Sequence, residues 1–224
     1  MHGGRGDLTR LIDDLADGRL TGSPIRDYVV LLQEAVEGGD RDARVAAARR
    51  GLSVHFGAVR GSPPRVTGNA IVSTRPLTNA RTIDLPRERQ PRAAVAATIQ
   101  IDGETMFVIA THLENRLGWL RGLFGDRARG RQAAALLREI PPRQHGILGG
   151  DMNTMLGPAE PAWRAFLDRF PDTPPNPEPT FRDRLVLDHL FMDLPDRWMT
   201  TRRVVEERYG SDHHPVLGVI YGSR

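Results

Sequence analysis

The segment 150–154, Gly-Asp-Met-Asn-Thr, places a carboxylate and a carboxamide two residues apart, directly after the apolar run 146–149. If that run is a buried strand, Asp151 and Asn153 point to the same side of its end, where they face an open rim and not the core. An acid beside an amide suits the binding of a hard divalent cation together with a phosphate oxygen. The same spacing is common in turns, where Asp and Asn bond their own backbone. This segment alone therefore leaves both interpretations open.

Four other apolar segments carry a titratable or metal-binding side chain at one end or inside. Any one of these side chains could be a satisfied surface group or a buried structural histidine. Five such segments in one chain favour a shared site at the rim of the strands. The four are Glu34 at the end of 28–34, His112 near the end of 106–114, Asp188 within 187–192, and the pair Asp212 and His213 ahead of 216–221.

In chain order these motifs resemble those of the endonuclease/exonuclease/phosphatase superfamily. This superfamily of metal-dependent phosphoesterases includes DNase I-like nucleases, sphingomyelinases and inositol polyphosphate phosphatases. The resemblance implies a DNase I-like fold of the α/β (α+β) class, a four-layer α/β/β/α sandwich. The matching motifs span most of the chain: LQE at 32–34, GNAIVS at 68–73, THL at 111–113, GDMN at 150–153, LDH at 187–189 and SDH at 211–213.

The resemblance also implies how the chain would cleave a phosphoester bond, most naturally a phosphodiester. Glu34 is expected to be the first ligand of Mg²⁺ or Mn²⁺, since a carboxylate is a hard oxygen ligand, and Asp212 is a second candidate. Asp151 would hold or orient the attacking water. Asn153 would support the phosphate or the metal.

The two histidines of the motifs are expected to handle protons and charge. His213 would act as general acid or base, because its reference pKa lies near neutrality. Asp188 would fix the tautomer of His213, as a buried acid does in catalytic pairs. His112 would donate a hydrogen bond to a phosphate oxygen in the transition state. Glu114 follows two residues later, and the sequence leaves open whether it supports the site or lies in a solvated loop.

Three further residues are candidates for substrate binding, each with a structural alternative. Asn69, after Gly68, either fixes a turn at the rim or contacts the substrate. Arg92 either binds phosphate or is a solvated arginine. Trp119 lies in the segment 117–125, which mixes Trp, Leu and Phe with Gly and Arg. That segment is either a loop packed on the core or a lip over the site that grips a base or a lipid interface.

Members of the superfamily open with a strand that ends in an Asn, and residues 1–4, Met-His-Gly-Gly, resemble the end of that motif. We therefore expect one domain over 1–224 from which this N-terminal strand and its Asn are missing. The resemblance implies that the Asn helps to hold the phosphate or metal. The alternative function is therefore a catalytically weak protein of the same fold that binds phosphorylated ligands.

Composition narrows the class of protein. A chain of 224 residues with 39% hydrophobic residues suits one domain with a sizeable core. The absence of cysteine excludes a disulfide framework, a thiolate metal site and a cysteine nucleophile. We find no apolar run near the roughly 20 residues of a membrane span and no charged-then-apolar leader. A cytoplasmic, monomeric enzyme is expected.

All 31 basic residues are arginine, and the net charge is +3. Every basic side chain is therefore a planar, permanently charged guanidinium that suits bidentate contact with phosphate. This favours a phosphate-bearing substrate. It does not distinguish nucleic acid from phospholipid or a small phosphodiester, because the charge is modest and aromatic residues are few.

Hydrophobic periodicity and turn residues predict the elements that position these side chains. Leu8, Leu11, Ile12 and Leu15 follow a helical period, and Asp102-Gly103 marks a hairpin between two strands. Helices are expected over 7–20, 40–50, 129–140 and 158–170, strands over 28–34, 52–59, 70–73, 93–101, 104–111, 146–149, 185–192, 199–206 and 216–221, and loops over 60–67 and 171–179.

Overall fold

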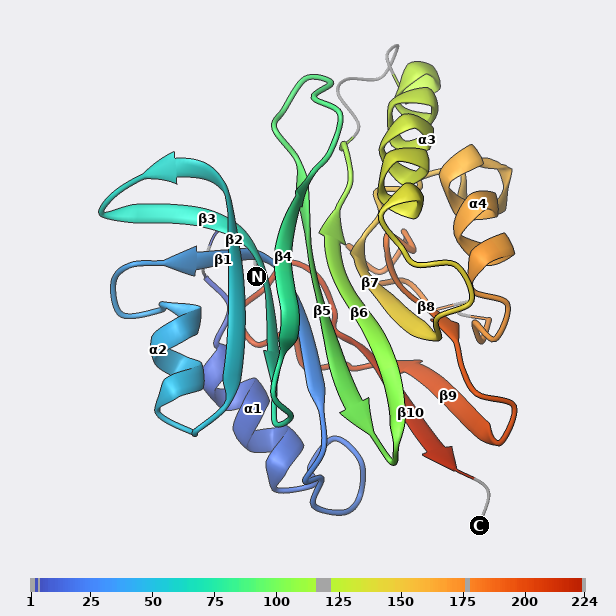
Figure 1. The fold of residues 1–224 in the computed structure, drawn as a ribbon. Helices are drawn as coiled ribbons and strands as arrows, with labels where there is room; N and C mark the ends of the chain where they lie inside the picture. The colour runs from blue at the N-terminus through green and yellow to red at the C-terminus, as the bar shows by residue number, and fades with distance from the viewer. Residues whose placement is uncertain (1–2, 4, 116–121, 176–177, 223–224) are drawn as a thin grey trace.

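The computed structural model describes residues 3, 5–115, 122–175 and 178–222. Two β-sheets lie face to face, and helices cover the outer face of each (Figure 1). The first sheet has the order β1-β3-β2, with β1 Val29–Glu37, β2 Ser53–Ser62 and β3 Arg65–Ser73. The second has the order β4-β5-β6-β7-β8, with β4 Thr78–Asp84, β5 Ala93–Ile101, β6 Glu104–His112, β7 Gly146–Asp151 and β8 Asp188–Asp193.

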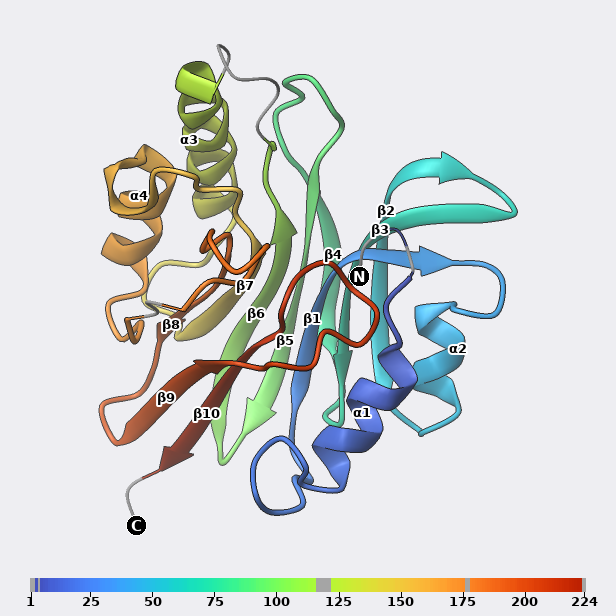
Figure 2. The ribbon, with the colours of Figure 1, turned by 180° about the vertical axis from the view of Figure 1, so that it is seen from behind.

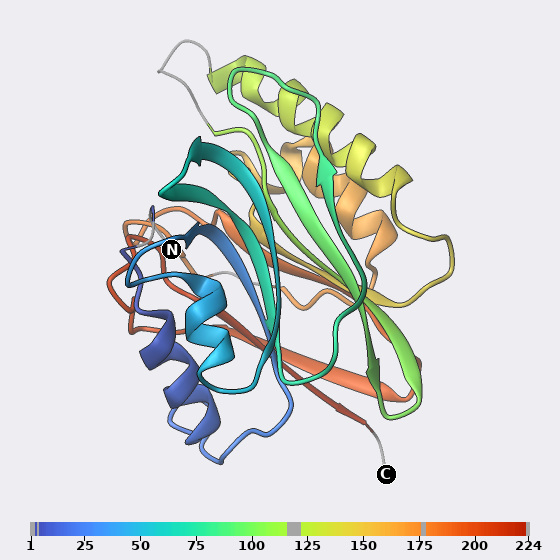
Figure 3. The ribbon, with the colours of Figure 1, turned by 60° about the vertical axis from the view of Figure 1, so that its left-hand side comes forward.

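The remaining elements flank these sheets. Strands β9 (Trp198–Val204) and β10 (Val216–Gly222) form a separate antiparallel pair. Helices α1 (Leu8–Ala16) and α2 (Ala43–Ala48) lie on the first sheet, and α3 (Gly122–Arg138) and α4 (Pro161–Arg169) lie on the second. The turn Gly157–Ala159 is a 3₁₀-helix. Figure 3 shows the layers in the order helix, sheet, sheet, helix, as expected from the sequence.

Three apolar clusters fill the spaces between the four layers. Leu8 and Ile12 of α1 pack with Val72 of β3, whereas Phe166 of α4 packs with Phe191 of β8. The cluster between the two sheets includes residues of β3, β5 and β6 (Ile71, Val95, Ala97, Ile99 and Val108). Strands β5 and β6 contribute to both sides, which explains their nearly continuous apolar sequences.

Most of the expected elements form, with one exception and one omission. Strand β5 has the expected bounds, and the hairpin turn at Asp102-Gly103 has φ of +48° and +83°, as a tight turn requires. The loop expected over 60–67 is wrong: β2 runs to Ser62 and β3 begins at Arg65, so these residues form a β-hairpin. Strand β4 was not predicted, because its sequence TNARTID alternates polar and small residues with few large apolar ones.

An apolar cleft of about 500 Å³ separates β1 from β10. Its lining includes Leu31 of β1, Val219 of β10, Val108 of β6, Ile147 of β7, and His213. Figure 2 shows β1 and β10 on either side of this region, with β5 and β6 behind. In the described part of the chain, neither β1 nor β10 pairs with a further strand at the edge facing the other.

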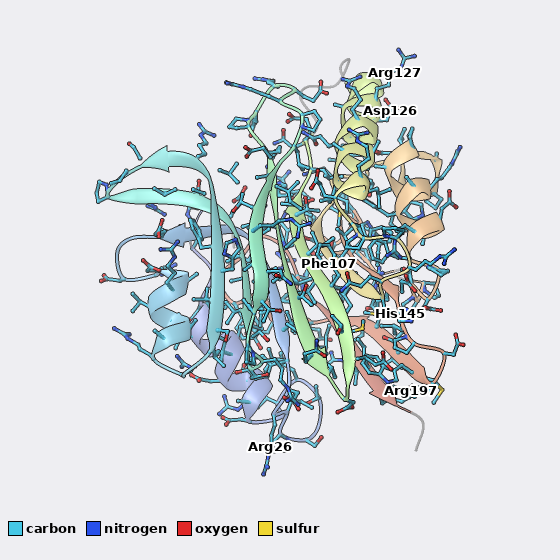
Figure 4. The ribbon with its side chains drawn as sticks, in the orientation of Figure 1. Arg26, Phe107, Asp126, Arg127, His145 and Arg197 are labelled. Atoms are coloured by element: carbon cyan, nitrogen blue, oxygen red, sulfur yellow. The ribbon has the colours of Figure 1, made fainter. Side chains whose placement is uncertain are left out.

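No helix within the described ranges is both long enough and apolar enough to span a membrane. Arginines are spread over the surface: Arg26, Arg127 and Arg197 are exposed and lie at the periphery (Figure 4). By contrast, Arg92 and Arg129 are buried, with 9% and 1% of their surface exposed.

Candidate active site

Three of the predicted site residues form a row across the second sheet. His112 ends β6, Asp151 ends the neighbouring β7, and Asp188 begins β8. The strand register pairs His112 with Asp151 and Asp151 with Asp188. Residues directly opposite each other on adjacent strands point to the same face, so the three side chains share one face at one end of the sheet.

Two glycines allow β7 to carry Asp151 to this place. A Cβ on Gly149 would lie 2.6 Å from Leu31 Cδ1 of the first sheet. Gly150 has φ of +152°, and a Cβ there would lie 1.9 Å from the carbonyl oxygen of Thr111. Gly150 is therefore required for the close approach of β6 and β7, whereas a Cβ at Gly149 would have to displace the Leu31 side chain of β1.

Asp151 is buried between a histidine and a second carboxylate. Its Oδ2 lies 3.3 Å from His112 Nε2, and its Oδ1 accepts the Asn153 backbone N–H at 3.0 Å. Burial and the charge of Asp188 raise the pKa of Asp151 to about 7. Asn153 has φ of +51°, and its amide donates to the Leu113 carbonyl at 3.2 Å. The turn interpretation of the Asp-x-Asn spacing therefore holds together with the rim position.

His213 reaches the row from the loop before β10. Its Nδ1 lies 2.7 Å from Asp188 Oδ2, and its ring packs 4.6 Å from Phe181. Burial acts to lower the pKa of His213, but the hydrogen bond to Asp188 and the charges of Asp188, Asp151 and Asp212 outweigh it and raise the pKa to about 9. His213 is therefore protonated at neutral pH.

The neighbouring histidines point elsewhere. His214 Nδ1 donates to the Val205 carbonyl at 2.9 Å, and its Nε2 accepts from Arg208 at 2.8 Å. His189 is 2% exposed and packs edge-on against Trp163. Backbone alternation turns both side chains away from the side of their neighbours Asp188 and His213.

Arg92 and His112 lie at the other side of Asp151, in a pocket of about 370 Å³ that Glu34 and Asn69 also line. Burial lowers the pKa of Arg92, partly offset by the charges of Glu114, Asp151 and Glu34. The Arg92 Nε has no hydrogen-bond partner among the described residues. Burial and the charge of Arg92 hold the pKa of His112 well below its usual range, so His112 is neutral.

Glu34 sits at a β-bulge of β1, with φ of +52°, and its Oε2 accepts the Gly3 N–H at 2.7 Å. No group of three or more His, Asp or Glu side chains is arranged to hold a metal ion in the part of the chain that the structure describes. The two predicted ligands Glu34 and Asp212 therefore do not form a closed protein cage. A single carboxylate in an open pocket still fits Mg²⁺, which is usually bound through one or two carboxylates together with substrate phosphate and water.

Of the three substrate-binding candidates, two are buried in the structure and the third is not described. Asn69 does not lie in a turn: it is within β3, is 2% exposed, and its amide donates to the Ala93 carbonyl at 2.7 Å. Arg92 is not solvated but buried. Trp119 lies outside the described residues.

Sequence reasoning missed two residues that hold the His213–Asp188 pair. The Thr180 hydroxyl accepts the N–H groups of Leu187 and Asp188, each at 3.0 Å, and the Thr180 carbonyl accepts the His214 N–H at 2.8 Å. Phe181 contacts the His213 ring. Both follow a proline-rich segment, and nothing in the local sequence distinguishes them from loop residues.

Comparison with known proteins places these motifs in a family. A family model described as Endonuclease/Exonuclease/phosphatase family matches residues 1–213. No curated protein matches the sequence.

Several solved structures are similar in fold. An endonuclease/exonuclease/phosphatase from Beutenbergia cavernae is 20% identical, with a TM-score of 0.68, over 98% of this chain and 68% of that one. The human Nocturnin catalytic domain with bound sulfate is 22% identical, with a TM-score of 0.62, over 86% and 78%. Sphingomyelinase C from Streptomyces griseocarneus is 18% identical, with a TM-score of 0.60, over 99% and 92%.

Proposed function

The chain belongs to the endonuclease/exonuclease/phosphatase family, and from this premise we propose that it is a metal-dependent hydrolase of phosphodiester bonds. The observation that carries the proposal is the row His112–Asp151–Asp188 with His213 bonded to Asp188 at 2.7 Å. Asp151, whose pKa is raised to about 7, and His213, whose pKa is raised to about 9, both neighbour Asp188 there.

The side chains divide the proton transfers between them. Asp151, ionised above its raised pKa, would orient the attacking water and accept its proton. His213, protonated at neutral pH, would donate a proton from Nε2 to the leaving oxygen, while Asp188 holds Nδ1. The sequence left open whether His213 is the general acid or the general base, and we propose that it is the general acid.

Two residues would bind the phosphate on the other side of Asp151. Arg92 offers a buried guanidinium whose Nε is unpaired among the described residues, and guanidinium binds phosphate oxygens through charge-assisted hydrogen bonds. Neutral His112 would donate a hydrogen bond to a phosphate oxygen. The amide nitrogens of Asn153 and Asn69 already donate to carbonyls, so their side-chain oxygens, which are acceptors, would serve a cation or its bound water.

Glu34 would hold the divalent cation, Mg²⁺ or Mn²⁺, with Asp212 as a second candidate ligand. When bound, such a cation offsets phosphate charge and lowers the pKa of water. The substrate would be nucleic acid, a phospholipid or a small phosphodiester. The fold neighbours include a structure with bound sulfate and a sphingomyelinase, which is compatible with each of these.

The test is hydrolysis of bis(p-nitrophenyl) phosphate, single-stranded DNA and sphingomyelin vesicles, with Mg²⁺ or Mn²⁺ and with EDTA. We expect turnover of at least one substrate with metal and its loss with EDTA. Turnover that is unchanged by EDTA would contradict the metal-dependent mechanism. Binding of phosphorylated compounds without any turnover would support the alternative, a catalytically weak phosphate-binding protein of the same fold.

A further inference from the structure

Glu114 is a buried carboxylate that the reaction proposed above does not use. It lies two residues after His112 and is 3% exposed. Its Oε2 accepts the backbone N–H groups of Arg89 and Gln90, each at 3.1 Å, and its Oε1 accepts the Asn115 N–H at 3.2 Å. The carboxylate thus bonds to backbone donors, two of which belong to a different loop.

That loop, residues 85–92, connects β4 to β5 and ends at Arg92. The Leu85 N–H donates to the Arg92 carbonyl at 3.0 Å, which closes the base of the loop. Gln132 of α3 donates to the Pro86 carbonyl at 3.1 Å and accepts the Glu114 N–H at 2.8 Å. Glu114 and Gln132 therefore join three segments: the loop, the end of β6 and helix α3.

The charge of Glu114 also acts on Arg92. Burial lowers the pKa of Arg92, and among the nearby acids the charge of Glu114 does most to raise it again. Burying a lone cation is costly. A carboxylate that is itself hydrogen-bonded to backbone amides offsets that cost without taking the guanidinium into a direct ion pair. The guanidinium then remains able to bind an anionic ligand.

We propose that Glu114 is a positioning residue that fixes the backbone of residues 89–90 and so holds the Arg92 guanidinium ready for a phosphate group in the pocket beside Asp151. This inference rests on the proposed function for the identity of the ligand. Its test measures binding of inorganic phosphate, which does not depend on turnover.

The experiment measures the Kd of inorganic phosphate by isothermal titration with the full chain, together with the melting temperature. Glu114→Gln weakens the hydrogen bonds from the Arg89 and Gln90 amides, because a neutral amide oxygen is a poorer acceptor than a carboxylate, and it removes the charge near Arg92. We expect it to weaken phosphate binding about tenfold, within the range of a hydrogen bond to a charged group, with a small change in melting temperature. Arg92→Gln should weaken binding by a similar factor, and the double variant should bind no more weakly than Arg92→Gln, because both changes act through one contact.

Glu88→Gln is the matched control. Glu88 is in the same loop, but its carboxylate pairs with Arg131, at 2.7 Å from each of two guanidinium nitrogens. It should leave the phosphate Kd unchanged. If Glu114→Gln does not fold, Glu114→Asp keeps the charge and retracts it by one methylene from the two amides. It too should weaken phosphate binding.

An unchanged phosphate Kd in Glu114→Gln would overturn the inference, also if the melting temperature falls, because a residue with only a structural role would give that result. Additive effects of Glu114→Gln and Arg92→Gln on the Kd of the double variant would overturn it as well. If the protein hydrolyses nothing but the binding pattern holds, the proposed function fails and the role of Glu114 stands.

Discussion

Asp151 lies between groups that perturb it in opposite directions. Burial and Asp188 raise its pKa, while His213 and Arg92 lower it, and the result is about 7. The same carboxylates raise the pKa of His213 to about 9. Pairs of groups with pKa values pushed apart identify acid and base roles. We therefore propose Asp151 as the base and His213 as the acid at pH values between about 7 and about 9.

The first prediction concerns pH. The profile of kcat/KM should be bell-shaped, because activity needs Asp151 deprotonated and His213 protonated. It should rise near pH 7 and fall near pH 9. Asp188→Asn removes the charge and weakens the bond that raise the pKa of His213, so the falling limb should move to lower pH. Profiles of both proteins at one fixed metal concentration test this, and an unmoved falling limb would assign the acid to another group.

The second prediction separates adjacent histidines. His213→Ala and Asp151→Asn should each lower kcat by at least about 10²-fold, the lower range for a positioned acid–base group. His214→Ala should have far less effect, because His214 bonds to Val205 and Arg208 and does not face Asp188. A larger loss for His214→Ala than for His213→Ala would show that the two roles are reversed.

How far the sequence predicts this site differs from residue to residue. Motif position placed His112 and Asp151 at strand ends and Asp188 inside a strand, whereas Asp188 is the first residue of β8. Strand register brings the three into one row. The burial of Arg92 could not be predicted, because it depends on the 85–92 loop being held by Glu114 and Gln132. Glu114 lies 25 and 24 positions along the chain from the Arg89 and Gln90 amides that it binds, and Gln132 lies 46 positions from Pro86.

At the scale of elements, Arg129 links helix α3 to the start of α4 through a buried ion pair and to the segment after β6 through a hydrogen bond. Arg129 Nε and Nη2 donate to the Glu160 carboxylate at 2.6 and 2.9 Å, and Arg129 also donates to the Glu114 carbonyl. Glu160 further accepts the Leu156 N–H at 3.0 Å. These contacts connect α3 with Glu114, just after β6, and with Leu156 and Glu160, which follow β7.

The third prediction is that Glu160→Gln lowers the free energy of unfolding by about 3–5 kcal/mol, because it leaves the buried Arg129 charge unpaired. Urea denaturation of the variant measures this. Glu104→Gln is the control: its partner Arg197 is 54% exposed, and breaking an exposed pair costs about 1 kcal/mol or less. Equal losses of unfolding free energy in the two variants would show that the buried pair stabilises the fold no more than the exposed pair does.

Sequence patterns predicted the elements with strong periodicity and missed those set by tertiary contacts. The apolar run of β5 and the Asp102-Gly103 turn were sufficient for their hairpin. The segment 60–67 was assigned to a loop because of its glycine and prolines, yet it completes the β2–β3 hairpin. Strand β4 forms because its backbone pairs with β5, and its own side chains gave no signal.

At the scale of the whole molecule, the candidate site adjoins the apolar cleft between β1 of the first sheet and β10 of the separate β9–β10 pair. The order β1-β3-β2 and the pair β10-β9 stop at strand edges that face each other across apolar side chains. The resemblance implies one more N-terminal strand, and we propose that such a strand would lie in this cleft. Its main-chain groups would pair with both edges, and its end would reach Gln33, Gly150 and His213.

The fourth prediction follows from that proposal. A form of the protein extended before Met1 by a strand should melt at a higher temperature than the 224-residue chain and bind less 1-anilinonaphthalene-8-sulfonate, because the apolar cleft would be filled. Thermal melts and dye titrations of both forms provide the measurement. Equal melting temperatures and equal dye binding would show that the cleft is not the seat of a strand.

The hydrogen bond from Gly3 to Glu34 has a practical consequence for labelling. The sequence contains no cysteine, so a Gly3→Cys variant would carry a single reactive thiol. A Cβ added at Gly3 meets nothing within 4 Å. A thiol-reactive fluorophore at this position should therefore lie near Glu34, the predicted metal ligand, and report titration of the site with Mn²⁺ as a change in emission.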